Sequence, residues 1–183
     1  MTEEQKRRTV ARLNGRTQAE AFEAAKAIWE DPDLGLEVSL ISTLRNGRRS
    51  FNRAAAAYSM QILRTPKTVR ALERTVEAKS EHSRVRGEAA EALAHGHRRR
   101  SHNVLLRGLG DPNKDVRFWC AFALGEMAEK RAIVALKRLV AIDKREVKGF
   151  WSVAKEAADA IENIERGNKA HRRKRGCCFC VGD

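Results

Sequence analysis

Apolar residues recur at helical spacing along most of the chain. The clearest run occupies positions i, i+3, i+4, i+7, i+8 and i+11: Val116, Trp119, Cys120, Ala123, Leu124 and Met127. This spacing places all six side chains on one face of a helix. A second apolar stripe soon follows: Ile133, Leu136, Leu139 and Val140. The stretch 111–145 therefore predicts two helices joined by a tight turn, with Asp111-Pro112 before the first and Arg131 near the start of the second.

The same pair of stripes returns at a nearly constant interval. Leu93 and Leu124 are 31 residues apart, and Leu106 and Leu136 are 30 apart. Earlier copies are marked by a capping box at Thr17–Glu20 and by Thr65-Pro66, an N-cap followed by proline. One such pair cannot bury its apolar stripe alone, so stacked pairs must share a core. The period predicts an all-α, right-handed α-α solenoid of four to five helical pairs.

Three segments are expected. Residues 1–16 carry charges of both signs and predict a short turn or a mobile tail. Residues 17–166 form the repeat domain. Residues 167–183 form a basic tail that contains Cys177, Cys178 and Cys180. No run reaches the ~18 apolar residues of a membrane span.

The central unit resembles a HEAT repeat, of the short kind also seen in phycobiliprotein lyases. The matching residues are Asp111, Pro112, Asp115, Val116, Arg117, Ala121, Ala123, Leu124, Gly125, Ala132, Ala135 and Leu136. The resemblance implies that Asp115 and Arg117 contribute to a ladder of polar contacts between units. Arg86 matches Arg117, but the other units offer no good acidic match to Asp115, so a continuous Asp-Arg ladder is not expected.

The formal net charge is +13, which favours acidic partners. The resemblance implies that the second helix of each pair lines a concave face, and the cations on these helices imply that this face is basic. The predicted partner-binding residues are Lys67, Arg70, Arg74, Arg107, Lys130, Lys137 and Arg138. An ordinary solvated surface is the competing interpretation.

Other features have less specific interpretations. The loop at 94–102 offers Arg98, Arg99 and Arg100 as additional contacts, and these cations argue against a metal site at the nearby histidines. Two aromatic pairs, Phe118-Trp119 and Phe150-Trp151, predict core positions, with Phe118 and Phe150 the more exposed members. The basic tail could act as an electrostatic arm for nucleic acid or an acidic surface, or its cysteines could bind a soft metal or carry lipid, but a solvated tail is the simpler interpretation.

No catalytic motif or phosphate-binding glycine loop is present, and no cofactor is expected. Four cysteines without a disulfide framework favour a reducing cytoplasm. We therefore expect a non-enzymatic scaffold that binds an acidic protein. The alternatives are a sequence-independent nucleic-acid binder and a protein with a lyase-like or chaperone role.

Overall fold

The computed structural model describes residues 1–94 and 99–167, with the side chains of 99 and 100 left out. This part of the chain is helical, and its only β pairing is an isolated bridge between Glu146 and Ser152. The helices are α1 (Glu3–Leu13), α2 (Gln18–Glu30), α3 (Glu37–Asn46), α4 (Ser50–Ser59), α5 (Pro66–Glu77), α6 (Ser83–Leu93), α7 (Arg99–Gly108), α8 (Lys114–Glu126), α9 (Ile133–Ile142) and α10 (Val153–Glu165). Two 3-10 turns, η1 (Leu34–Leu36) and η2 (Lys130–Ala132), precede α3 and α9.

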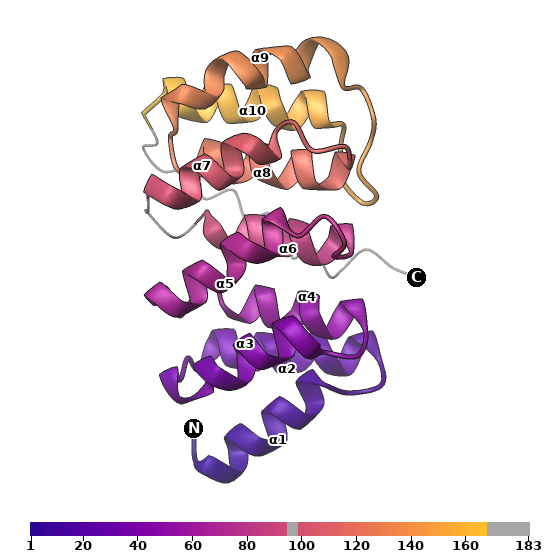
Figure 1. Ribbon diagram of the computed structural model, residues 1–183, viewed down its shortest axis with the longest axis vertical. Helices are drawn as coiled ribbons and strands as arrows, with labels where there is room; N and C mark the ends of the chain where they lie inside the picture. Colours follow the sequence, from indigo (N-terminus) through magenta and orange to yellow (C-terminus); the bar gives the residue numbers. More distant parts are fainter. Residues whose placement is uncertain (95–98, 168–183) are drawn as a thin grey trace.

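The helices stack in two layers along the long axis of the molecule (Figure 1). We call α2, α4, α6, α8 and α10 the first helices, and each packs on the next in this order. We call α3, α5, α7 and α9 the second helices. They pack closely on α4, α6, α8 and α10 respectively, which are the first helices of the following pairs. The predicted all-α solenoid is confirmed, with ten helices in the described residues.

Local sequence signals fix several helix ends. The Thr17 hydroxyl accepts a hydrogen bond from the Glu20 amide, and the Glu20 side chain accepts in return from the Thr17 amide, as the capping box predicts. Thr65 caps α5, whose first residue is Pro66. Helix α3 ends at Asn46, directly before Gly47. The two predicted helix starts, at Thr17 and Thr65, are confirmed.

The N-terminal segment differs from the prediction. Residues 3–13 form α1, with Thr2 and Gln5 making a second capping box. Leu13 is fully buried, and α1 packs on α2. The segment is a docked helix and not the short amphipathic turn or mobile tail that was expected, because Met1 and Val10 also pack against the core and Lys6 pairs with Asp33 at 3.1 Å.

The core lies between the two layers and between successive first helices. Leu124 of α8 is fully buried, where α8 packs on α10. A side chain on Gly125 would place its Cβ 2.8 Å from the Cα of Ala160. The absence of a side chain at Gly125 therefore allows the close crossing of α8 and α10. Among the described helices, none is long and apolar enough to cross a membrane.

Candidate functional site: an arginine ladder and a basic face

Three first helices carry an arginine at the same place, their fourth residue. These arginines are Arg53 of α4, Arg86 of α6 and Arg117 of α8. A positive charge in the first turn is opposed by the helix dipole, so each arginine needs a nearby acid. Each finds that acid in the segment before the next first helix, in the pairs Arg53–Glu81, Arg86–Asp111 and Arg117–Asp143.

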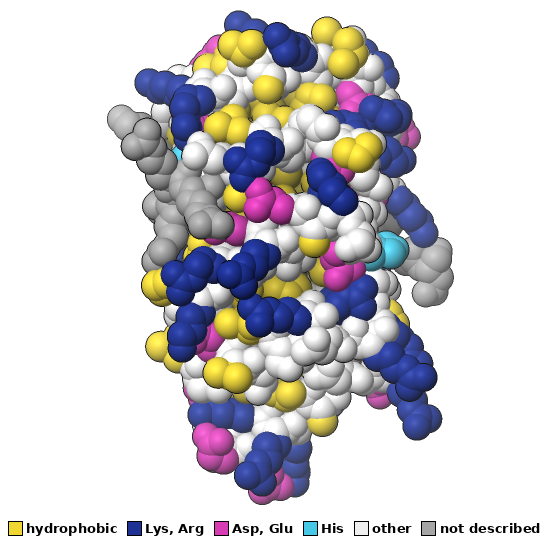
Figure 2. All heavy atoms as spheres, viewed as in Figure 1, with side chains coloured by type: hydrophobic (Ala, Val, Ile, Leu, Met, Phe, Trp, Pro, Cys, Tyr) yellow, Lys and Arg dark blue, Asp and Glu magenta, His cyan; other side chains and the backbone are white. Residues whose placement is uncertain are grey.

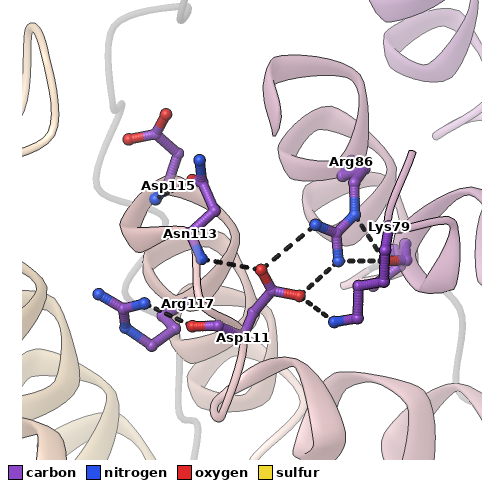
Figure 3. Close-up of polar contacts among 7 residues, drawn as sticks. Lys79, Arg86, Asp111, Asn113, Asp115 and Arg117 are labelled. Carbon is purple, nitrogen blue, oxygen red and sulfur yellow. Dashed lines mark hydrogen bonds and ion pairs between the residues drawn. The ribbon is translucent and has the colours of Figure 1, made fainter. Parts of the chain in front are cut away.

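Asp111 is the centre of the middle pair, and Figure 3 shows how the surrounding donors converge on it. Its carboxylate accepts hydrogen bonds from Arg86, from the Lys79 ammonium and, at 3.0 Å, from the Asn113 amide. Arg86 also donates to the Val76 carbonyl at 2.9 and 2.8 Å. Burial alone would raise the pKa of Asp111, but the donors outweigh it, Arg86 most of all, and lower the pKa to about 2.

Arg117 is held by residues on both sides of α8. Its Nε donates to Asp143 Oδ2 at 2.7 Å, and its Nη1 donates to the Asp111 carbonyl (Figure 3). Arg145 donates to the other oxygen of Asp143 at 2.7 Å. Burial acts to raise the pKa of Asp143, yet the hydrogen bonds from the two arginines leave it lowered. Arg117 therefore joins two units through an acid one repeat away.

Asp115 makes a polar contact with the preceding unit, as the resemblance implies. Its carboxylate accepts a hydrogen bond from the Ser83 hydroxyl at 3.2 Å, and its amide donates to Asn113. The acids that pair with arginine are Glu81, Asp111 and Asp143. The ladder is thus continuous from α4 to α10, contrary to expectation. The 32-residue spacing of Asp111 and Asp143 was the sequence signal that would have identified it.

The ladder ends at α10. The fourth residue of this helix is Glu156, a buried carboxylate that accepts a hydrogen bond from the Trp151 indole at 2.9 Å. A carboxylate suits the first turn of a helix without an external partner. The change from arginine to glutamate therefore marks the last described unit as different from those before it.

The predicted partner-binding cations lie on or beside the second helices. Lys67, Arg70 and Arg74 occupy one face of α5 at i, i+3 and i+7, and all three are exposed. Lys67 is 69% exposed, with its ammonium 4.0 Å from a Glu37 oxygen. Figure 2 shows Lys and Arg side chains gathered over α5. Solvent screens such a distant pair, so these cations remain available to a partner.

The remaining cations of this set continue along the stack. Arg107 of α7 pairs with Glu77 of α5, and both are largely exposed. Lys130 lies in η2, while Lys137 and Arg138 lie on the exposed side of α9. We call the set Lys67, Arg70, Arg74, Arg107, Lys130, Lys137 and Arg138 the second-helix face.

Apolar side chains are exposed on these same second helices. Val134 and Ile142 of α9 are 66% and 77% exposed, and Val38 of α3 is 72% exposed. Val134 precedes Lys137 and Arg138 by three and four residues, and Ile142 follows Arg138 by four. Helical spacing therefore places cations and branched apolar residues on one surface of α9.

The loop candidates fall at the edge of what the structure describes. Arg98 lies outside the described residues, as do the side chains of Arg99 and Arg100. The tail cysteines lie outside as well. His102, the described histidine of this region, contacts the Glu129 carboxylate. Hydrogen bonds from Arg131 are the main cause that lowers the pKa of Glu129 to about 2.

The aromatic pairs differ in part from expectation. Phe118 is 1% exposed, so its predicted exposure is wrong. It packs against three rings, with centroid distances of 5.2 Å to Trp119, 5.4 Å to Phe150 and 6.2 Å to Trp151. These three rings are half-buried. The loop before α10 folds back onto α8, which is why Phe118 is enclosed.

The comparison with protein families agrees with this architecture. The family model for HEAT repeats matches residues 75–153, from the end of α5 to the start of α10. No curated protein matches the chain. Residues 75–153 therefore resemble HEAT repeats, which form helical scaffolds commonly used for protein interaction. Their likeness to the short repeats of phycobiliprotein lyases stays a prediction.

Proposed function

We propose that this chain is a non-enzymatic scaffold that binds an acidic protein through its second-helix face. The observation that carries the proposal is the surface of α9, where Lys137 and Arg138 stand beside exposed Val134 and Ile142. Cations steer an acidic partner, and apolar side chains gain free energy only against a partner with apolar surface of its own. A phosphate backbone offers no such surface, which favours protein over nucleic acid.

The cations of α5 extend the proposed interface. Lys67, Arg70 and Arg74 lie along an adjacent second helix, and their charges are only weakly compensated. Arg107 bridges the two regions through its contact with Glu77, which a partner carboxylate could replace. The placement of this face on the concave side of the array belongs to the same proposal.

The test is a charge reversal on α9. In Lys137→Glu/Arg138→Glu, proteins captured from a lysate by the wild-type chain should be lost, because like charges now oppose the acidic partner. The matched control is Arg7→Glu/Arg12→Glu, which makes the same charge change on exposed residues of α1. Quantitative mass spectrometry of the captured proteins is the measurement. Equal capture by the reversal variant and the control would contradict the proposal.

The salt dependence of binding distinguishes a nucleic-acid partner from a protein partner. The wild-type chain is titrated with a fluorescent 20-base-pair duplex at several NaCl concentrations. A nucleic-acid scaffold would show log affinity falling linearly with log salt, with a slope of about −0.9 per phosphate neutralised. We expect only weak binding of this kind, and duplex binding tighter than capture of any protein would favour the nucleic-acid alternative.

A further inference from the structure

The first helices present a surface unlike that of the second helices. It is formed by Arg84, Glu88 and Glu91 of α6, Asp115, Trp119, Phe122 and Glu126 of α8, and Lys155, Asp159 and Glu162 of α10. We call this set the first-helix face. It contains six carboxyl groups and two cations, although the whole chain has a net charge of +13. Opposite charge and aromatic surface together suit a basic segment that also carries apolar residues.

Side-chain contacts make this face continuous. A Cβ on Gly87 would lie 2.6 Å from Trp119, so the indole of α8 rests directly on α6. On the other side, the Arg84 guanidinium lies 5.3 Å from the Phe22 ring centroid and donates to the Gln18 amide oxygen at 2.8 Å. Arg84 thus reaches α2 across α4. A ligand on this face would touch several helices at once.

Glu88 marks a position on this face where a cation would be stabilised. Its side chain is buried, and its Oε2 has no hydrogen-bond partner among the described residues. The helices that pack closely on α6 are α4, α5 and α8. Burial, and to a smaller extent the neighbouring Glu91, raise the pKa of Glu88 well above its usual value, and a cation over this side of α6 would favour its charged form.

The direction of the helices gathers the acids at one edge. Figure 1 shows α6, α8 and α10 running in the same direction, so their C-terminal ends lie at the same edge of the stack. Glu91, Glu126 and Glu162 lie in the last turns of these three helices, and Glu162 already pairs with Arg166 at the end of α10. Partial negative charge at helix C-termini adds to these carboxylates and favours cations.

We propose that the chain's own C-terminal segment, residues 168–183, docks across this edge of the first-helix face. Five cations fall within seven residues of the segment, Lys169, Arg172, Arg173, Lys174 and Arg175, and its single acid is the terminal Asp183. A short apolar run with Phe179 and Val181 follows. The basic run pairs with Glu126 and Glu91.

The length of the segment fits this path. It begins directly after the last turn of α10, whose C-cap is Arg166. An extended chain covers about 3.3–3.6 Å per residue, so the stretch from Arg166 to Arg173 can span roughly 24 Å. Packed helices are about 8–10 Å apart, so the basic run crosses α8 and reaches α6. Docking within one chain needs no second molecule and therefore has a high effective concentration.

The test measures trypsin cleavage after Lys169, Arg172, Arg173, Lys174 and Arg175 in the full chain, by mass spectrometry. In Glu91→Lys/Glu126→Lys these bonds should be cut about tenfold faster than in the wild-type chain, because the docking carboxylates are reversed. The matched control is Glu23→Lys/Glu30→Lys on exposed positions of α2, which should leave the rate unchanged. Circular dichroism checks that each variant is folded.

A second measurement needs no substitution. Cys120 is fully buried and burial raises its pKa to about 12, so a thiol reagent reports on the tail cysteines alone. Their labelling should accelerate severalfold between 0.05 and 1 M NaCl as docking is screened. The proposal would be overturned by equal cleavage rates in the wild-type chain and the Glu91→Lys/Glu126→Lys variant. A rate of cysteine labelling that does not change with NaCl concentration would also overturn it. Protection that grows with protein concentration would also overturn it in favour of the tail of a second copy.

Discussion

The ladder and the second-helix face both contain arginines, but those of the ladder are paired with acids and little exposed, whereas those of the face are exposed. Arg117 is 5% exposed and holds a buried carboxylate from the next unit. Arg138 is exposed on α9, and Arg70 and Arg74 are exposed on α5. Arginine is always charged, so the difference lies in burial and partners and not in protonation.

This difference distinguishes charges that stabilise the array from charges that remain available to bind a ligand. A buried pair has already lost its water, and removing one partner strands the other charge. An exposed cation keeps its water and can exchange it for a ligand at little cost to folding. The ladder therefore joins the repeat units, and we propose that the exposed cations serve in binding.

The largest expected effect comes from breaking the ladder. Arg117→Ala leaves Asp143 buried with less compensation, and the loss from breaking a buried pair is about 3–5 kcal/mol. For a domain of this size that corresponds to a melting temperature lower by roughly 10 °C. Arg138→Ala is the matched control and should change little. Thermal melts followed by circular dichroism decide the matter, and equal melting temperatures for the two variants would remove the distinction.

The second-largest expected effect is a loss of stability at acid pH, where the carboxylates of the ladder become protonated. The folded pKa of Asp111 is about 2, below the ~3.9 of an unfolded aspartate. Its carboxylate therefore stabilises the fold fully above about pH 4, and this contribution is lost as pH falls toward 2. Asp111→Asn should melt well below the wild-type chain at pH 6, with the gap narrowing by pH 2.5. A gap that stays constant across this range would show that the Asp111 charge contributes nothing.

Much of the ladder and the fold could be predicted, but not the partners of the arginines. Leu93 and Leu124 share a period because apolar stripes record burial directly, and Thr17 and Thr65 mark helix starts through local hydrogen bonds. Arg117 was recognised as a ladder residue. Its acid was not, because Asp143 lies in a loop: the 32-residue spacing from Asp111 indicates a repeated position, but the side chain that each acid contacts is set by packing between units.

On the surface of the molecule, too, some features could be predicted from the sequence and others could not. Exposed Lys137 and Arg138 could be placed on a second helix from spacing alone. Burial of Phe118 could not be foreseen, because it depends on the fold of the loop that carries Phe150 and Trp151. Glu88 gave no sequence signal at all, since its environment arises from three helices that are brought together only in the folded array.

The smallest expected effect concerns the exposed pair Arg107–Glu77, whose side chains are 63% and 40% exposed. A double-mutant cycle with Arg107→Ala and Glu77→Ala should give a coupling energy of about 0.5 kcal/mol or less, because solvent screens both charges and holding two long side chains costs entropy. The same cycle with Arg86→Ala and Asp111→Ala should give at least a few kcal/mol. Urea unfolding at 0.05 and 0.5 M NaCl measures both, and salt should abolish only the first coupling. A coupling for Arg107–Glu77 as large as that for Arg86–Asp111 would mean that the second-helix face also carries the stability of the array, and its cations would then not be free for a partner.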